Sequence, residues 1–201
     1  MADRLIGHMD AEFEKSRILI DAIRTDRLLR AQIVDVVKRA TDALGRGNKI
    51  LFAGNGGSAA DAQHWAAELV SRFNYDRPGL PGIALTTDTS ALTAIGNDYG
   101  YERVFARQLE ALGRKGDLLF AISTSGNSKN ILAAIDAARS IGIDVVGFTG
   151  RKGGTMAGCC TVCLHTPSDE TPKIQEGHEL IGHLICGLIE REMFPPSAGD
   201  A

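Results

Sequence analysis

A short apolar run, a polar turn and a helical segment follow one another twice in this chain, and this pattern constrains its fold more than any other feature. The first unit has its apolar run at 49–53, the turn GNGGS at 54–58 and a helical pattern at 59–73. The second has its run at 117–122, the turn STSGNS at 123–128 and a helical pattern at 131–141. Repeated strand–turn–helix units are typical of a parallel sheet that helices cover on both faces.

The remaining segments extend the same pattern. Three further apolar runs are predicted strands, at 82–85, 145–148 and 161–164. Helical periodicity predicts three more helices, at 89–96, 102–112 and 173–193. Residues 1–45 carry two amphipathic series, which predict two helices, the second ending at Gly45 or Gly47.

Length and composition favour one folded unit. The chain has 201 residues, of which 44% are hydrophobic, enough for one sizeable core but not for two comfortable domains. The sequence contains no linker. We therefore predict an α/β fold with a parallel sheet flanked by helices on both faces, an N-terminal helical extension at 1–45, a domain at 46–196 and a tail at 197–201.

Charge and hydropathy exclude several classes of protein. The formal net charge is −3 and the pI about 5.9, and no face is plainly basic, which argues against nucleic acid as the main partner. The first residues mix acids and bases without an apolar segment, so no secretory signal is predicted. The chain lacks the long apolar run that a membrane span needs. We expect a cytoplasmic protein.

The four cysteines are Cys159, Cys160, Cys163 and Cys186. Cys160 and Cys163 form a C-x-x-C pair, a spacing found in metal sites, but those usually have a second pair elsewhere. Here the single pair lies in a predicted buried strand. The interpretation we favour is buried thiols in a reducing compartment, with metal or redox use as the alternative.

Both polar turns lie where ligands bind in an open α/β sheet, beyond the carboxyl ends of strands. The turn STSGNS offers hydroxyls, backbone N–H groups and a helix N-terminus, which together suit a phosphate. It lacks the lysine of a nucleotide-binding P-loop, so a small phosphorylated metabolite is favoured over a nucleoside triphosphate. The alternative is an ordinary turn in which Ser128 caps the next helix. The glycines of GNGGS would let a ligand approach the backbone closely.

Two helices carry potential metal ligands. His64 and Glu68 are four residues apart and share one helix face, although a solvated surface pair has the same spacing. The last helix adds five candidates, Gln175, Glu176, His178, Glu179 and His183, without the H-E-x-x-H motif. Spacing does not choose among them. Glu179 and His183 look the better pair by spacing, and zinc prefers a carboxylate to an amide.

Four strings in order, GNGGSAADAQHWAAELVSRF, AIGNDYG, AISTSGNS and IQEGHELIGH, resemble the phosphoheptose isomerase family of the sugar-isomerase (SIS) domain class. The resemblance runs in register across nearly the whole chain. It implies conversion of sedoheptulose 7-phosphate to D-glycero-D-manno-heptose 7-phosphate, for lipopolysaccharide or capsule synthesis. It also implies a homotetramer with active sites at subunit boundaries.

The same resemblance assigns roles to residues at matching positions. Sugar contacts are implied for Asn55, Gly56 and Gly57, for Asn97 and Asp98 from a loop, and for Glu68 and Gln175. Phosphate contacts are implied for Ser123, Thr124, Ser125 and Ser128. A zinc ion is implied on His64, Glu68, Gln175 and His183. Glu68 and His183 are also the implied acid/base pair.

Two alternatives share this fold. RPGLPGIALTTDTSALTAI and the end of the last helix also resemble a DnaA initiator-associating adaptor family, in which the positions of Glu68 and His183 hold other residues. The presence of both here favours the enzyme. A phosphosugar-sensing regulatory domain is the third class, but such domains usually carry a DNA-binding module, and residues 1–45 are predicted to be packing helices.

Overall fold

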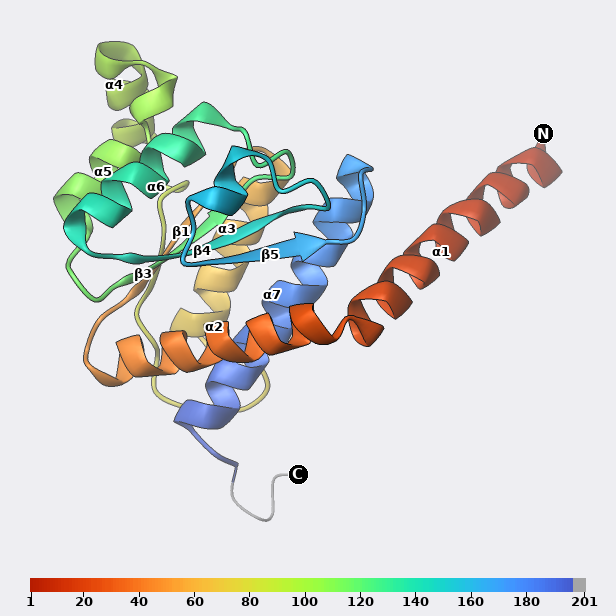
Figure 1. The fold of residues 1–201 in the computed structure, drawn as a ribbon, viewed down its shortest axis with the longest axis horizontal. Helices are drawn as coiled ribbons and strands as arrows, with labels where there is room; N and C mark the ends of the chain where they lie inside the picture. The colour runs from red at the N-terminus through yellow and green to blue at the C-terminus, as the bar shows by residue number, and fades with distance from the viewer. Residues whose placement is uncertain (197–201) are drawn as a thin grey trace.

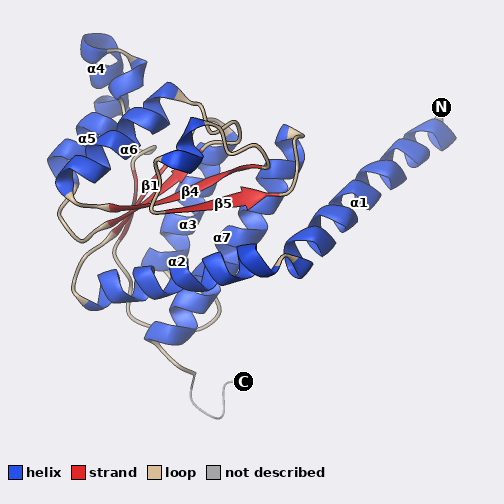
Figure 2. Ribbon diagram, in the orientation of Figure 1, coloured by secondary structure: helices blue, strands red, loops and turns tan. Residues whose placement is uncertain are grey.

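The computed structural model describes residues 1–196, so the predicted tail at 197–201 lies outside the described residues. Figure 1 shows the course of the chain and Figure 2 its helices and strands. The helices are α1 (Ala2–Thr25), α2 (Arg27–Gly45), α3 (Gly57–Val70), α4 (Thr89–Tyr99), α5 (Ala106–Leu112), α6 (Lys129–Ile141) and α7 (Thr171–Met193). The strands are β1 (Ile50–Ala53), β2 (Gly82–Ala84), β3 (Leu118–Ile122), β4 (Asp144–Gly150) and β5 (Val162–Thr166). Two short 3-10 helices are η1 (Tyr101–Arg103) and η2 (Thr155–Gly158).

The five strands form one parallel sheet in the order β2-β1-β3-β4-β5, which confirms the predicted α/β fold. The side chains of α2, α3 and α7 pack on one face of the sheet, and those of α5 and α6 on the other. In Figure 2 the strands lie between these helices. The two strand–turn–helix units of the sequence therefore form parallel strands joined by helices, and helices cover both faces of the sheet.

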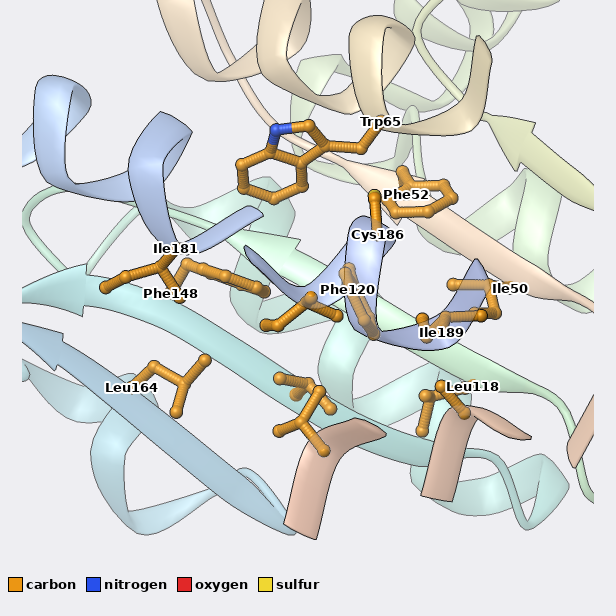
Figure 3. Packing of buried hydrophobic residues seen from close by; sticks show 14 of the residues in the cluster. Ile50, Phe52, Trp65, Leu118, Phe120, Phe148, Leu164, Ile181, Cys186 and Ile189 are labelled. Carbon is orange, nitrogen blue, oxygen red and sulfur yellow. The ribbon is translucent and has the colours of Figure 1, made fainter. Parts of the chain in front are cut away.

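An aromatic cluster forms the centre of the first face, between the sheet, α3 and α7 (Figure 3). Trp65 of α3 is fully buried, and its ring centroid lies 4.9 Å from that of Phe148 and 6.5 Å from that of Phe52. Gly182 of α7 passes directly over the indole: a Cβ there would lie 2.1 Å from Trp65 Cε2. This close approach fixes α7 against α3, the two helices that carry the candidate metal ligands.

Helix α1 extends away from the rest of the chain (Figure 1). It buries only Leu19 and Ile23. Its exposed large apolar side chains are Met1, Leu5, Ile6, Met9, Phe13, Ile18 and Ile20. Such a large exposed apolar surface is typical of an interface with another chain.

Several helix bounds differ from the prediction: the helix predicted at 102–112 is divided into η1 and α5, α6 begins at Lys129 instead of residue 131, and α7 begins at Thr171 instead of residue 173. Two further ends have a visible local cause. Helix α3 ends at Val70 instead of residue 73, because the guanidinium of Arg77 binds the last carbonyls, donating to those of Glu68 and Leu69. Helix α4 continues to Tyr99 instead of 96, and it ends at Gly100, whose φ of 82° suits glycine. None of the helices in residues 1–196 is long and apolar enough to cross a membrane.

Candidate active site

Two helices, α3 and α7, bring four potential ligands together. Nε2 of His64 lies 3.0 Å from Nε2 of His183, although the two residues are 119 positions apart. Oε1 of Glu68 lies 3.0 Å from Nε2 of His64, one turn along the same helix. Oε1 of Glu179 lies 2.9 Å from Nε2 of His183 and 3.7 Å from Nε2 of His64. The structure thus places three of the predicted ligands in one cluster and adds Glu179.

The donor atoms of His64, Glu179 and His183 all lie within 4.8 Å of one another. Two imidazole nitrogens and a carboxylate oxygen are the donors that zinc and similar divalent ions bind in proteins. The residues present therefore fit a divalent metal ion. The cluster is half-exposed, with the His64 and Glu179 side chains 47% and 33% accessible, so a substrate can reach it.

Glu179 is held in place by a buried neighbour. The indole N–H of Trp65 donates to Oε2 of Glu179 across 2.9 Å. Oε1 is left to face the two imidazoles. The four-residue spacing of Glu179 and His183 predicts that they pair, but no sequence pattern indicates the bond from Trp65, which lies 114 positions away.

Asp61 lies one turn before His64 on α3 and is part of the same environment. Partial burial and the negative charge of Glu179 raise the pKa of Asp61 to about 6, while His64 opposes the shift. Its Oδ2 is buried without a hydrogen-bond partner in the described part of the chain. The Asp61 carboxyl beside the four ligands therefore keeps its proton to a higher pH than a solvated aspartate does.

Gln175, the fourth implied ligand, lies against the first glycine-rich turn. A Cβ added to Gly57 would lie 2.4 Å from the amide nitrogen of Gln175, so a larger residue at this position would make the Gln175 side chain shift. Within residues 1–196 the Gln175 side chain makes no hydrogen bond to the imidazoles. Gln175 therefore connects α7 to the turn that is predicted to contact the sugar. In the same turn, Gly56 has a φ of 56°.

Asn55 of the same turn is fixed by two residues that the sequence did not single out. Its amide exchanges hydrogen bonds with that of buried Asn130 at the start of α6, at 2.9 and 2.8 Å. The hydroxyl of Tyr101 also donates to Oδ1 of Asn55, at 3.1 Å. Because these partners lie 75 and 46 positions away, no local pattern could have predicted them.

The second turn follows β3 and carries the four residues predicted to bind phosphate, of which Ser123 is buried. Ser123 donates from its hydroxyl to that of Ser128 at 3.0 Å, and the Ser125 hydroxyl accepts from the backbone of Asn127 at 3.2 Å. Thr124 and Ser125 line a cavity of about 300 Å³. Ser128 occupies the N-cap of α6 without a capping hydrogen bond from its side chain, so the capping alternative does not describe its hydroxyl.

Asn97 and Asp98 do not join the other predicted residues. Both are exposed and lie in the last turn of α4, a helix and not the loop that was expected. The Asn97 side chain donates to Asp98 at 2.8 Å. Helix α4 stands at the edge of the molecule in Figure 1, and it has no buried residue. The structure leaves these two side chains outside the cluster.

The two cysteines of the C-x-x-C pair pack against β4. All four cysteines are free, and within residues 1–196 none belongs to a cluster of three potential metal ligands. The sulfurs of Cys160 and Cys163 both pack against Gly147, where a Cβ would lie 2.7 and 3.1 Å from them. Cys163 and Cys186 are buried as predicted, whereas Cys159 and Cys160 are half-buried.

This chain is similar in sequence and fold to known proteins. A family model described as "SIS domain" matches residues 13–150. The phosphoheptose isomerase of Burkholderia pseudomallei (strain 1710b) is 52% identical over 194 residues, 96% of this chain and 98% of that protein. The phosphoheptose isomerase of Aliarcobacter butzleri (strain RM4018) is 62% identical over 156 residues, 78% of this chain and 82% of that protein. A solved structure of the phosphoheptose isomerase from Neisseria gonorrhoeae has a TM-score of 0.86 and 43% identity, covering 92% of this chain and 98% of that one.

Proposed function

This chain belongs to the phosphoheptose isomerases of the SIS domain family, and we propose that it converts sedoheptulose 7-phosphate to D-glycero-D-manno-heptose 7-phosphate. The observation that carries the proposal is the convergence of Glu68, His64 and His183 on one point of the α3–α7 contact. An adaptor has no need of a carboxylate and two imidazoles at that point. The cluster therefore supports the isomerase over the adaptor.

Ketose–aldose isomerisation needs a base and an acid on adjacent carbons. Glu68 would take the proton from the carbon beside the ketose carbonyl, and His183 would act as the acid that completes the transfer at the neighbouring carbon. His64 lies within 3.0 Å of both side chains and holds them together. A divalent ion at this cluster, zinc in the resemblance, would supply Lewis-acid stabilisation of the negative charge on the enediolate oxygens.

The two turns would hold the rest of the substrate. Backbone and amide groups of Asn55, Gly56 and Gly57 are suited to the sugar hydroxyls, with Gln175 beside them. The hydroxyls of the second turn, together with the N-terminus of α6, would bind the phosphate. The residues of this second group are Ser123, Thr124, Ser125 and Ser128. Asn97 and Asp98 would reach the sugar only after α4 moves inward.

We further propose that the chain assembles into a homotetramer with its active sites at subunit boundaries. The exposed apolar side chains of α1 support this, since only Leu19 and Ile23 of this helix are buried in its own chain. An apolar groove that includes Phe73, Leu184 and Leu188 also runs beside His183. A cytoplasmic location and delivery of the heptose to lipopolysaccharide or capsule stay predictions of the sequence.

The test is a substrate comparison. The purified, metal-loaded protein is incubated with sedoheptulose 7-phosphate or with unphosphorylated sedoheptulose, and the aldose product is followed by NMR. We expect the protein to convert the phosphate ester and to convert the free sugar at least about tenfold more slowly. The free sugar lacks the phosphate that the second turn would bind. Failure to convert either sugar would contradict the proposal, and binding to the replication initiator would then be measured.

A further inference from the structure

Two cysteine sulfurs meet over one glycine near β5, the strand at one edge of the sheet. Gly147 of β4 is the register partner of Cys163 in β5. A Cβ on Gly147 would lie 2.7 Å from the sulfur of Cys160 and 3.1 Å from that of Cys163. The two sulfurs therefore lie side by side, and their C-x-x-C spacing is one that thiol–disulfide pairs use.

Both thiols border the same cavity. Cys160 and Cys163 line a cavity of about 490 Å³ beside β5, together with residues that include Gln32 and His165. Cys160 is half-buried, whereas Cys163 is 8% exposed. A molecule as small as hydrogen peroxide can therefore reach the pair while the sheet stays folded.

The contact between the two thiols makes Cys163 the more reactive sulfur. A hydrogen bond from the Cys160 thiol lowers the pKa of Cys163, although burial opposes this shift. The same hydrogen bond, together with burial, raises the pKa of Cys160. Because the thiolate is the form that attacks an oxidant, Cys163 is the expected first target, with the Cys160 thiol beside it.

A short path of hydrogen bonds leads from this pair to the second turn. The N–H of Cys160 donates to the carbonyl of Met156 in η2 at 3.3 Å, and the N–H of Met156 donates to the carbonyl of Gly126 at 3.0 Å. The N–H and the hydroxyl of Thr155, also in η2, donate to Oδ1 of Asn127, each at 2.9 Å. Gly126 and Asn127 belong to the turn predicted to bind phosphate. Helix η2 therefore contacts this turn and leads directly into the cysteines.

We propose that Cys160 and Cys163 form a modification site for hydroperoxides, and that their disulfide loosens the second turn through η2. The Cys163 thiolate attacks a peroxide oxygen, the O–O bond breaks, and a sulfenic acid and hydroxide are formed. The Cys160 thiol then attacks the sulfenic sulfur, so that the S–S bond forms, the S–O bond breaks and water leaves. Altogether two thiols lose two electrons and two protons, and hydrogen peroxide is reduced to two molecules of water.

The new bond changes the position of Cys160 because bonded sulfurs are only about 2.0 Å apart. A shift of Cys160 toward β5 pulls on the contacts that η2 makes with Gly126 and Asn127. In a reducing compartment a disulfide of this kind is transient, which suits a redox sensor and not a structural bond. An effect on substrate binding rests on the proposed isomerase function, whereas the disulfide and the loosening of the turn do not.

Disulfide formation is tested by mass spectrometry of the full-length, metal-loaded protein. The reduced parent is treated with a small excess of hydrogen peroxide, free thiols are alkylated, and the tryptic peptide 153–173 is analysed, which holds Cys159, Cys160 and Cys163. We expect peroxide to remove two alkylation sites from this peptide in the parent and in the control Cys159→Ser, and dithiothreitol to restore them. Cys160→Ser and Cys163→Ala should show no such paired loss. A parent that keeps all three sites, or the same paired loss in Cys160→Ser, would overturn the proposal.

The effect on the turn is tested by hydrogen exchange, which needs no substrate. The amides of residues 123–128 should exchange faster in the oxidised parent than in the reduced one, with no effect of peroxide in Cys160→Ser. The KM for sedoheptulose 7-phosphate should rise about fivefold or more on oxidation and return with dithiothreitol. Unchanged exchange in a parent that carries the disulfide would overturn the link to the turn. A parent without turnover would contradict the isomerase function alone, because alkylation and exchange do not depend on it.

Discussion

Arg77 and Glu190 form an ion pair inside the protein, with Nε of Arg77 3.1 Å from Oε1 of Glu190 and side chains that are 2% and 0% exposed. Glu190 also accepts the backbone N–H groups of Phe73 and Asn74, at 2.7 and 2.6 Å. Arg77 in turn donates to the carbonyl of Glu68 at 2.7 Å. The pair therefore ties the end of α3 to α7 and holds the backbone of the proposed base.

Replacing Glu190 with glutamine should strongly destabilise the fold. The substitution leaves the Arg77 guanidinium buried without a counter-charge, which typically costs about 3–5 kcal/mol. Unfolding in urea would measure the loss. Exposed Glu192, on the same helix, is the matched control, and Glu192→Gln should change the free energy of unfolding by less than about 0.5 kcal/mol. Equal stability of the two variants would show that the pair contributes nothing.

Stability should also fall in mildly acid solution because of His178. Burial lowers the pKa of this imidazole to about 4, and its side chain is fully buried on α7. In the unfolded chain an imidazole takes up its proton near pH 6.5, so protonation favours unfolding as the pH falls from about 6.5 to about 4. Neutral His178 therefore makes its full contribution to the free energy of unfolding above pH 6.5. About 3 kcal/mol of this free energy is lost by pH 4.

The test of this dependence is the slope of the unfolding free energy between pH 6.5 and pH 4. His178→Leu removes the titrating group and should flatten the slope, whatever its effect on stability at pH 7. Exposed His8→Gln on α1 is the control and should keep the slope of the parent. An unchanged slope in His178→Leu would assign the acid sensitivity to other groups.

Gly182→Ala should disturb the α3–α7 contact directly. Its Cβ would lie 2.1 Å from the buried indole of Trp65, and overpacking of this kind costs about 1–3 kcal/mol or more. We expect weaker zinc binding as well, because His183 follows Gly182 and Glu179 binds Trp65. Gly7→Ala in α1 is the control: a Cβ there meets nothing within 4 Å, and the change should stabilise the helix slightly. Parent-like stability in Gly182→Ala would mean that α7 moves aside freely.

Thr124→Val should affect substrate binding through the phosphate alone. The substitution keeps the shape of the side chain and removes a hydroxyl that lines the cavity beside the second turn. A hydrogen bond to a charged group contributes about 1.5–3 kcal/mol, so the KM for sedoheptulose 7-phosphate should rise about tenfold or more. Steady-state kinetics would show this, with exposed Thr25→Val on α1 as the control. An unchanged KM would place the phosphate elsewhere.

Periodicity and turn chemistry predicted the order of strands and helices because both are local properties of the sequence. The ends of helices depended on more distant residues. Arg77 lies beyond the end of α3 and donates hydrogen bonds to the last carbonyls of that helix. No pattern inside the helix predicts this contact. The extra turn of α4, up to Gly100, carries Asn97 and Asp98 in a helix where a loop was expected.

The candidate site was predicted only in part, because some of its contacts are local in the sequence and others join distant residues. His64 and Glu68 are neighbours by helical spacing, so the sequence alone could pair them, although it could not distinguish a site from a solvated face. The meeting of His64 with His183 requires the close packing of Gly182 on Trp65, which is a tertiary contact. Spacing favoured Glu179 over Gln175, and the structure places Glu179 with the imidazoles, whereas the resemblance had assigned Gln175 to the metal.

The most direct measurement of the central claim is turnover of sedoheptulose 7-phosphate by the parent, Glu68→Gln and His183→Gln, each with its metal content determined. The account predicts conversion by the parent, and rates lower by about 10²-fold or more in both variants, because each lacks one member of the acid/base pair. Parent-like rates in both variants, or a folded and metal-loaded parent that leaves the substrate unchanged, would contradict it.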